Sequence, residues 1–362
     1  MQRIGVIGGG LAGLTVAYRA AQAGRSVVLV EPADRLGGQL WTVHDQGFTV
    51  ELGAEGFVAR SEAVPALADA LGIGAALVGQ SETRSYGFDG ARLVPLAPGE
   101  AATFLGFQVP RDELGKGIRT FQRGMGQLSD ALAGELTSSL RDRVELRLGA
   151  RAATVTPVGS GFRIPLEGGS AVDVSSIVVA TGAVAAASLL ADAFGEPARA
   201  LAAAPTLSSC TVTLAYPRDA IDHPLDGTGF VVAAPHQEHG FRASTFITSK
   251  FPDRAPEGQA SLRIFFRPAA EDLAAMSDAA WTARAEACLG RVLPVRGSAS
   301  RSWVSRWAAA LPVFEPAHKA RVLALEAALA GRGVSLAGAA FHGSGIDAAV
   351  RSAEAAALAI SG

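Results

Sequence analysis

Residues 4–13 read IGVIGGGLAG, an apolar run followed by glycines at positions 8, 10 and 13 in the spacing GxGxxG. An alanine-rich pattern of helical period comes next, and a second apolar run then ends in Glu31. This order predicts a strand, a tight turn, a helix and a second strand. In such a unit Gly8 permits the turn, Gly10 lets a pyrophosphate approach the backbone, and Gly13 lets the helix pack closely on the strand. The N–H groups at the helix start face the phosphates and Glu31 faces a ribose, so we predict a dinucleotide site.

The composition fits a globular α/β enzyme. The chain has 362 residues, 49% of them hydrophobic, which is long enough for two domains or one large body. Its net charge is −2 with no run of basic residues, which argues against a nucleic-acid partner. Cys210 and Cys288 are predicted to be buried thiols, and no residues have the spacing of a metal site. No stretch approaches the about 18 apolar residues of a membrane span, so we expect a cytoplasmic protein, with peripheral contact at the inner face of the membrane left open.

The order of the predicted elements divides the chain into two units. Between about residues 205 and 268, four β-rich segments predict an antiparallel sheet. A strand and a helix near the C-terminus return to the first unit. We therefore predict an α/β fold with a discontinuous Rossmann-like domain over residues 1–80, 120–204 and 300–362, and a substrate domain over residues 81–119 and 205–299.

Two further glycine motifs support a resemblance to a known family. They are Arg35-Leu36-Gly37-Gly38 and Glu51-Leu52-Gly53. Together with the first turn and Glu31, they resemble the FAD-binding superfamily that includes monoamine oxidases, phytoene desaturases, renalase and protoporphyrinogen oxidases. The resemblance implies FAD and the two-domain fold of the p-hydroxybenzoate hydroxylase type, but it does not specify a substrate.

Three stretches look like the bacterial porphyrinogen oxidases in particular: residues 53–60, residues 120–125, and residues 306–318 followed by 336–338 and 343–346. This resemblance implies an oxidase of heme biosynthesis that removes hydrides from protoporphyrinogen IX or coproporphyrinogen III, with molecular oxygen reduced to hydrogen peroxide. The helical insertion usual in that family is missing, because only the short stretch 93–119 stands in its place. The chain is thus identified as a compact variant, similar in length to renalase.

The resemblance also implies cofactor contacts. A helix dipole at residues 345–347, aimed at the pyrimidine end of the flavin, would stabilise the charge gained on reduction. For Trp307, expected beside the ring, plain core packing is the alternative. The full set comprises Gly8, Gly10, Leu11, Ala12, Gly13 and Glu31 at the ADP half, Arg35, Gly37 and Gly38 nearby, Gly53, Ala54, Glu55 and Gly56 along the flavin, and Ala152, Thr181, Trp307, Gly338, Gly345, Ile346 and Asp347.

Four arginines are candidate clamps for the propionates of a porphyrinogen, because a guanidinium binds a carboxylate in fork geometry. They are Arg60, Arg242, Arg263 and Arg267, with Arg60 and Arg267 favoured and structural ion pairs as the alternative. His342 is a candidate acid or donor beside the flavin, against a structural contact. No other catalytic side chain is required, because the flavin takes the hydride.

Two alternatives stay open. One is a renalase-like or other small-molecule FAD oxidase acting on a nicotinamide, amine or desaturation substrate. Amine oxidases of this superfamily place a lysine on the corresponding strand. The strand predicted over residues 208–216 contains no lysine, which disfavours an amine substrate. The other is a flavin-binding protein without enzymatic activity.

Overall fold

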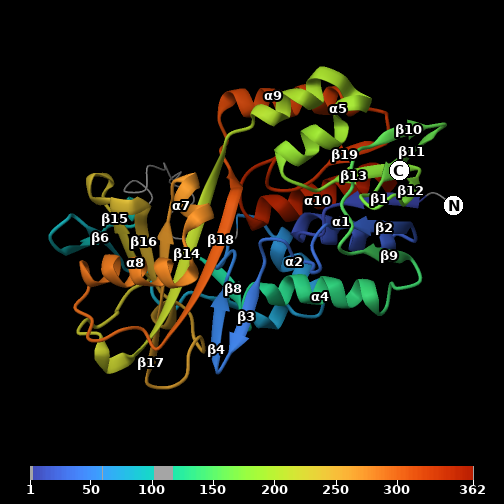
Figure 1. Ribbon diagram of the computed structural model, residues 1–362. Helices are drawn as coiled ribbons and strands as arrows, with labels where there is room; N and C mark the ends of the chain where they lie inside the picture. Colours follow the sequence, from blue (N-terminus) through green and yellow to red (C-terminus); the bar gives the residue numbers. More distant parts are fainter. Residues whose placement is uncertain (1–2, 59, 102–116, 362) are drawn as a thin grey trace.

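The computed structural model describes residues 3–58, 60–101 and 117–361, and its two main sheets lie at opposite ends of the molecule (Figure 1). Among the described residues, five strands form a parallel sheet in the order β19-β13-β1-β2-β9. The strands are β1 (Arg3–Ile7), β2 (Ser26–Val30), β9 (Val144–Arg147), β13 (Ser176–Val179) and β19 (Val334–Leu336).

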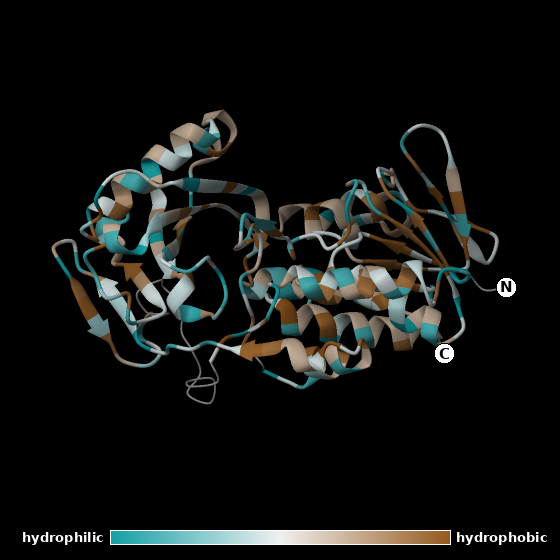
Figure 2. Ribbon diagram, turned by 90° about the horizontal axis from the view of Figure 1, so that it is seen from below, coloured by the Kyte–Doolittle hydropathy of each residue, from teal (hydrophilic) through white to brown (hydrophobic). Residues whose placement is uncertain are grey.

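Both faces of this sheet are covered, which explains why its three central strands, β13, β1 and β2, contain no polar side chain after their first residue. On one face, α1 (Leu11–Gln22), α4 (Gly126–Thr137) and α10 (Ile346–Ser361) share an apolar core with the strands. On the other lie α5 (Ala183–Arg199), α9 (Pro316–Leu329) and a meander of β10 (Thr156–Val158), β11 (Gly161–Pro165) and β12 (Ala171–Val174). In Figure 2 the strands of the sheet are brown, as their burial requires.

The turn between β1 and α1 needs glycine because backbone atoms touch there. Gly8 has a φ of +110°, which side chains other than that of glycine rarely allow. A Cβ added at Gly13 would lie 1.8 Å from the carbonyl oxygen of Gly8, far closer than two non-bonded atoms can approach. Helix α1 therefore packs directly on the end of β1, and the predicted strand, turn, helix and strand are confirmed.

In the described part of the chain, seven strands form the second sheet, in the order β18-β14-β17-β16-β15-β6-β7. They are β6 (Ser85–Phe88), β7 (Leu93–Leu96), β14 (Thr206–Pro217), β15 (Gly229–Val232), β16 (Phe241–Phe246), β17 (Gln259–Phe266) and β18 (Arg301–Pro312). Neighbours are antiparallel except β15 and β6, which are parallel. The predicted antiparallel sheet is thus confirmed, with one parallel pair added. Helices α7 (Ala270–Ala275) and α8 (Asp278–Gly290) cover one face through the buried Trp281.

The remaining elements connect the two sheets. They are β3 (Thr42–Asp45), β4 (Phe48–Glu51), α2 (Ala63–Ala70), β5 (Leu77–Gly79), β8 (Arg119–Phe121) and α6 (Ile247–Lys250). Much of the short stretch 93–119 lies outside the described residues, which omit 102–116. The domain boundaries stay a prediction, and β18 pairs along its length with β14 of the second sheet. None of the helices in the described ranges combines the length and apolarity needed to cross a bilayer.

The glycine contact gives a direct test. We expect Gly13→Ala to lower the free energy of unfolding by about 3 kcal/mol or more, because its methyl group has no space against backbone. A matched control is Gly134→Ala in α4, where an added Cβ meets nothing within 4 Å and where we expect a gain of about 0.5–1 kcal/mol. Urea unfolding of both variants measures this. Equal stability of Gly13→Ala and the wild type would contradict the close packing.

Candidate active site

Two glycine segments form a cradle at the carboxyl end of β1. The N–H of Gly37 donates to the carbonyl of Gly9 at 2.8 Å, and Gly10 and Gly37 form an isolated parallel bridge. A Cβ added at Gly38 would lie 3.0 Å from the Cα of Gly10. A Cβ added at Gly10 would meet only the Cα of Gly38, at 3.9 Å, so the space above Gly10 is open.

The charges around the cradle suit a phosphate and a ribose. Helix α1 has no side-chain cap and no acidic residue in its first turn, so its N–H groups and positive dipole end face outward. The carboxylate of Glu31 accepts from the N–H of Gly9 at 2.6 Å and from that of Ala33 at 2.9 Å. These bonds fix the carboxylate beside the turn, at the end of β2.

Other predicted contacts border the same edge of the sheet. Thr181 follows β13, and its Cγ2 lies 3.3 Å from a Cβ added at Gly8. A Cβ added at Gly338, after β19, would lie 3.4 Å from the Cβ of Ala12. Ala152 lies at the base of the meander, where it bridges to Leu166.

A third glycine-containing segment, residues 51–56, begins at the last residue of β4 and is held against β18. A Cβ at Gly53 would lie 1.8 Å from the carbonyl oxygen of Gln39, so the two segments touch through backbone. The carbonyl of Leu52 accepts from Nε1 of Trp307 at 2.7 Å and from Oγ of Ser305 at 2.6 Å. The partly exposed Trp307 packs edge-on against Trp41, with 6.5 Å between the ring centres.

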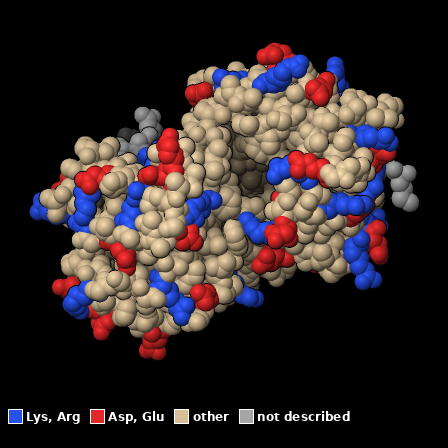
Figure 3. Space-filling view, in the orientation of Figure 1, with Lys and Arg blue, Asp and Glu red and all other residues tan. Residues whose placement is uncertain are grey.

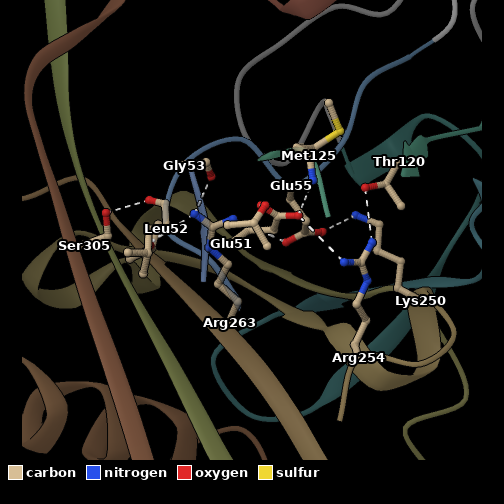
Figure 4. Close-up of polar contacts among 12 residues, drawn as sticks. Glu51, Leu52, Gly53, Glu55, Thr120, Met125, Lys250, Arg254, Arg263 and Ser305 are labelled. Carbon is tan, nitrogen blue, oxygen red and sulfur yellow. Dashed lines mark hydrogen bonds and ion pairs between the residues drawn. The ribbon is translucent and has the colours of Figure 1, made fainter. Parts of the chain in front are cut away.

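Five ionisable side chains, each at most 10% exposed, meet where this segment contacts the seven-stranded sheet and α6, and we call them the buried charge cluster: Glu51, Glu55, Lys250, Arg254 and Arg263 (Figure 4). Nζ of Lys250 donates to Oε1 of Glu55 at 2.6 Å, and Nη1 of Arg263 lies 3.8 Å from Oε2. Nη1 of Arg254 lies 3.8 Å from Oε1 of Glu51. Arg263 also donates to the carbonyl of Gly53 at 2.6 Å, which joins the cluster to the glycine segment.

The two carboxylates of the cluster have opposite pKa shifts. Burial raises the pKa of Glu51 to about 7, although the hydroxyl of Thr42 and the N–H of Met125, both at 2.7 Å, favour its charged form. Burial alone would raise the pKa of Glu55 too, but the charges of Lys250 and Arg263 outweigh it, so this pKa is lowered. Glu55 is therefore ionised at neutral pH, while Glu51 titrates there.

A cavity of about 380 Å³ lies over the seven-stranded sheet, with cationic and aromatic walls. Arg242 of β16 and Arg267, which follows β17, both line it, and Lys250 lines it from α6. Burial and the nearby charge of Arg267 lower the pKa of Arg242, so the two guanidiniums repel each other. Val231 and Phe265 supply apolar surface. The cavity thus suits a flat apolar molecule with an acidic edge.

Two of the predicted substrate arginines lie elsewhere. Arg263 is only 2% exposed and belongs to the buried charge cluster, so its predicted role as a carboxylate clamp is corrected to an internal one. Arg60 lies in the turn before α2, next to Ser61, and does not line the cavity.

His342 and Asp347 also make internal contacts. Nε2 of His342 lies 3.4 Å from Oε1 of Glu326, in a groove between α9, β19 and α10, so the structure does not place it in the cavity as an acid. The carboxylate of Asp347 accepts from Oγ of Ser61 at 2.7 Å and pairs with Arg351 at 3.0 Å. It fixes the start of α10, which leaves Gly345 and Ile346 to present backbone there.

Sequence reasoning missed Lys250 and the cluster around it. Lys250 is one of three lysines in a chain otherwise rich in arginine, and that rarity was the available signal. Its pairing with Glu55, 195 positions earlier, depends on how the two sheets are joined. In Figure 3 the surface is hollowed between the strands β14 and β18 and the parallel-sheet unit, where this junction lies.

A Rossmann-like sheet with a glycine cradle, joined to a second sheet that carries a cavity, defines a two-domain oxidoreductase with a dinucleotide cofactor. The family model described as flavin containing amine oxidoreductase matches residues 95–361, and that of the NAD(P)-binding Rossmann-like domain matches residues 6–71. The chain belongs to the flavin containing amine oxidoreductase family. It is an FAD-dependent oxidoreductase, as the sequence predicted.

Relatives and solved structures agree with this assignment. The chain is 25% identical to the coproporphyrinogen III oxidase of Bacillus subtilis (strain 168), over 94% of both chains. It is 45% identical to that of Mycobacterium tuberculosis (strain ATCC 25618 / H37Rv) over 26% of this chain and 21% of that protein. Similar folds are an Exiguobacterium sp. 255-15 protein provisionally assigned as a protoporphyrinogen oxidase (TM-score 0.82, 22% identity, 99% and 98% covered) and cyclohexylamine oxidase from Brevibacterium oxydans IH-35A (TM-score 0.75, 16% identity, 99% and 98% covered).

The residues present fit FAD. The cradle lies at the turn where a Cβ on Gly13 would clash with the backbone of Gly8. The start of α1 lacks an acidic side chain that would repel phosphate. When bound, FAD supplies the acceptor for the substrate's electrons. The protein's own groups orient the substrate, exclude water and set the local charge.

The raised pKa of Glu51 makes stability depend on pH. Its pKa in the folded protein, about 7, lies above the ordinary 4.5, so the folded state binds this proton more tightly. The resulting contribution is full below pH 4.5 and is lost as pH rises through 7, a change of about 3 kcal/mol.

We therefore expect the wild type to lose unfolding free energy relative to Glu51→Gln between pH 5 and 8, because glutamine does not titrate. Denaturant unfolding at several pH values measures the difference in unfolding free energy between the two proteins. The titration of Glu55 cancels in this difference because both proteins contain Glu55. A difference that stays constant with pH would show that Glu51 does not titrate in this range.

Proposed function

We propose that this enzyme is a porphyrinogen oxidase. It removes hydrides, with the accompanying protons, from coproporphyrinogen III or protoporphyrinogen IX in successive rounds to give the porphyrin, and dioxygen becomes hydrogen peroxide. The step belongs to heme biosynthesis. The observation that carries the proposal is the cavity in which Arg242 and Arg267 face the same space as the phenyl ring of Phe265.

The cavity matches the shape and charge of such a substrate. A porphyrinogen is a broad apolar macrocycle with propionate carboxylates on its rim. Guanidiniums bind carboxylates with paired hydrogen bonds, and the repulsion between Arg242 and Arg267 is relieved when carboxylates arrive. Phe265 packs against the macrocycle. The names of the Bacillus and Mycobacterium relatives support the same substrate class.

The cofactor would span the junction of the two units. We place its diphosphate over Gly8 to Gly10 and the start of α1, and its ribose at Glu31. The flavin would follow residues 53–56, with Trp307 as a wall beside it. Three supports are the open cradle, the carboxylate held beside it and the backbone contact of Gly53 with Gln39.

The substrate arginines give a specific expectation. We expect Arg242→Met and Arg267→Met each to raise KM for coproporphyrinogen III about tenfold or more while kcat changes little, because each loses charge-assisted bonds made before the reaction. A matched control is Arg163→Met, whose exposed ion pair with Asp173 lies in the meander. Porphyrin fluorescence under air, with FAD content checked for each variant, provides both constants.

The proposal itself is tested with FAD-loaded wild-type protein. Formation of fluorescent porphyrin from either porphyrinogen, well above the rate in buffer, is expected. If neither porphyrinogen reacts, but a nicotinamide or amine bleaches the flavin under anaerobic conditions, the enzyme is a small-molecule oxidase of another type. KM values unchanged in both arginine variants would remove the carboxylate clamp from the proposal.

A further inference from the structure

The buried charge cluster contains more positive than negative charge. Lys250, Arg254 and Arg263 supply three cations, against the two carboxylates Glu51 and Glu55. With both carboxylates ionised, the net charge is therefore +1. Any protonation of Glu51 makes it more positive.

This charge is removed from solvent. The five side chains have exposures of 2–10%. At such burial neither salt nor water screens a charge effectively. Its field therefore acts on whatever lies against the cluster.

Within the cluster the excess is not neutralised, and the one further carboxylate that acts on Arg254 among the described residues, Asp253, is exposed to solvent. Nε and Nη1 of both Arg254 and Arg263 are buried with no hydrogen-bond partner among the described residues. A void of about 10 Å³ beside them, lined by both arginines and both glutamates, has room for about one water molecule. A water is neutral, so the positive charge persists. An uncompensated buried charge is costly, and an anion that forms beside it would offset that cost.

The cluster lies where an anion would form in the reaction. On one side the cluster holds residues 51–56, because Glu55 belongs to this segment and Arg263 donates to the carbonyl of Gly53. On the other side Lys250 lines the substrate cavity. Under the proposed placement of the cofactor, the flavin lies along this segment, and a flavin gains negative charge on reduction.

We propose that the buried charge cluster raises the reduction potential of the bound flavin, and that the opposite charges of Lys250 and Glu55 set the size of this effect. Lys250 favours the reduced cofactor by its positive charge, and Glu55 moderates that effect while holding the lysine in place. Both act through charge, not by contact with the reacting atoms. The inference rests on the proposed cofactor placement, but not on a porphyrinogen being the substrate.

The experiment measures the two-electron potential of the FAD-loaded protein by equilibration with a reference dye, in the absence of any substrate. We expect Lys250→Met to lower the potential and Glu55→Gln to raise it, each by about tenfold in the ratio of oxidised to reduced flavin, or about 30 mV. The double variant should return close to the wild type. Matched controls are Lys319→Met on the exposed face of α9 and Glu167→Gln in an exposed ion pair, which should leave the potential unchanged.

Opposite shifts separate charge from structure, because a purely structural pair would move both single variants the same way or not at all. Either of those results would overturn the inference. If Lys250→Met fails to fold, Glu51→Gln at pH 8 replaces it: loss of a negative charge must raise the potential, and no rise refutes the proposal. Porphyrinogen oxidation with unshifted potentials would leave the proposed function standing without this inference. Shifted potentials in a protein that does not oxidise porphyrinogens would support this inference and refute the proposed function.

Discussion

The direct contact between Gly13 and the backbone of Gly8 is the constraint on which the nucleotide unit depends. With no side chain between them, α1 starts at the very end of β1 and directs its N–H groups over the cradle. The same approach leaves the N–H of Gly9 next to Glu31, and this bond fixes the carboxylate at the end of the neighbouring strand. In the proposed placement of the cofactor, phosphate and ribose recognition would therefore both follow from one close packing of helix on strand.

The second unit is joined to the first largely through charge. Near the junction the apolar contacts form a small core around Phe48, Val50 and Ala215. The bonds that cross it are polar: Lys250 to Glu55, Arg263 to Gly53, and Trp307 to Leu52. Charged hydrogen bonds depend steeply on distance and direction, so they hold the glycine segment at a defined position against the sheet. Apolar packing of the same area would define that position less sharply.

The nucleotide unit was predictable from the sequence because its signals are local. The glycine spacing and Glu31 lie within one strand, turn, helix and strand, and their geometry is set by neighbours along the chain. The side chains at the junction are different. Arg263 and Phe265 share one face of β17, yet Arg263 is covered by residues 53–55 while Phe265 lines the cavity. A period of two residues reveals the shared face but not what covers it, and His342 was misplaced for the same reason.

The contrast between the arginines explains how one residue type serves two roles. Arg263 gives its bonds to the protein itself, with a backbone carbonyl at 2.6 Å and a carboxylate nearby. Arg242 and Arg267 line the cavity, where burial and the charge of Arg267 lower the pKa of Arg242. An incoming dianionic edge removes the repulsion between the two guanidiniums, whereas a neutral ligand leaves it in place. Under the proposed function, the repulsion between its own cations would make the cavity favour an anionic edge over a neutral one, even if its apolar walls accepted many flat molecules.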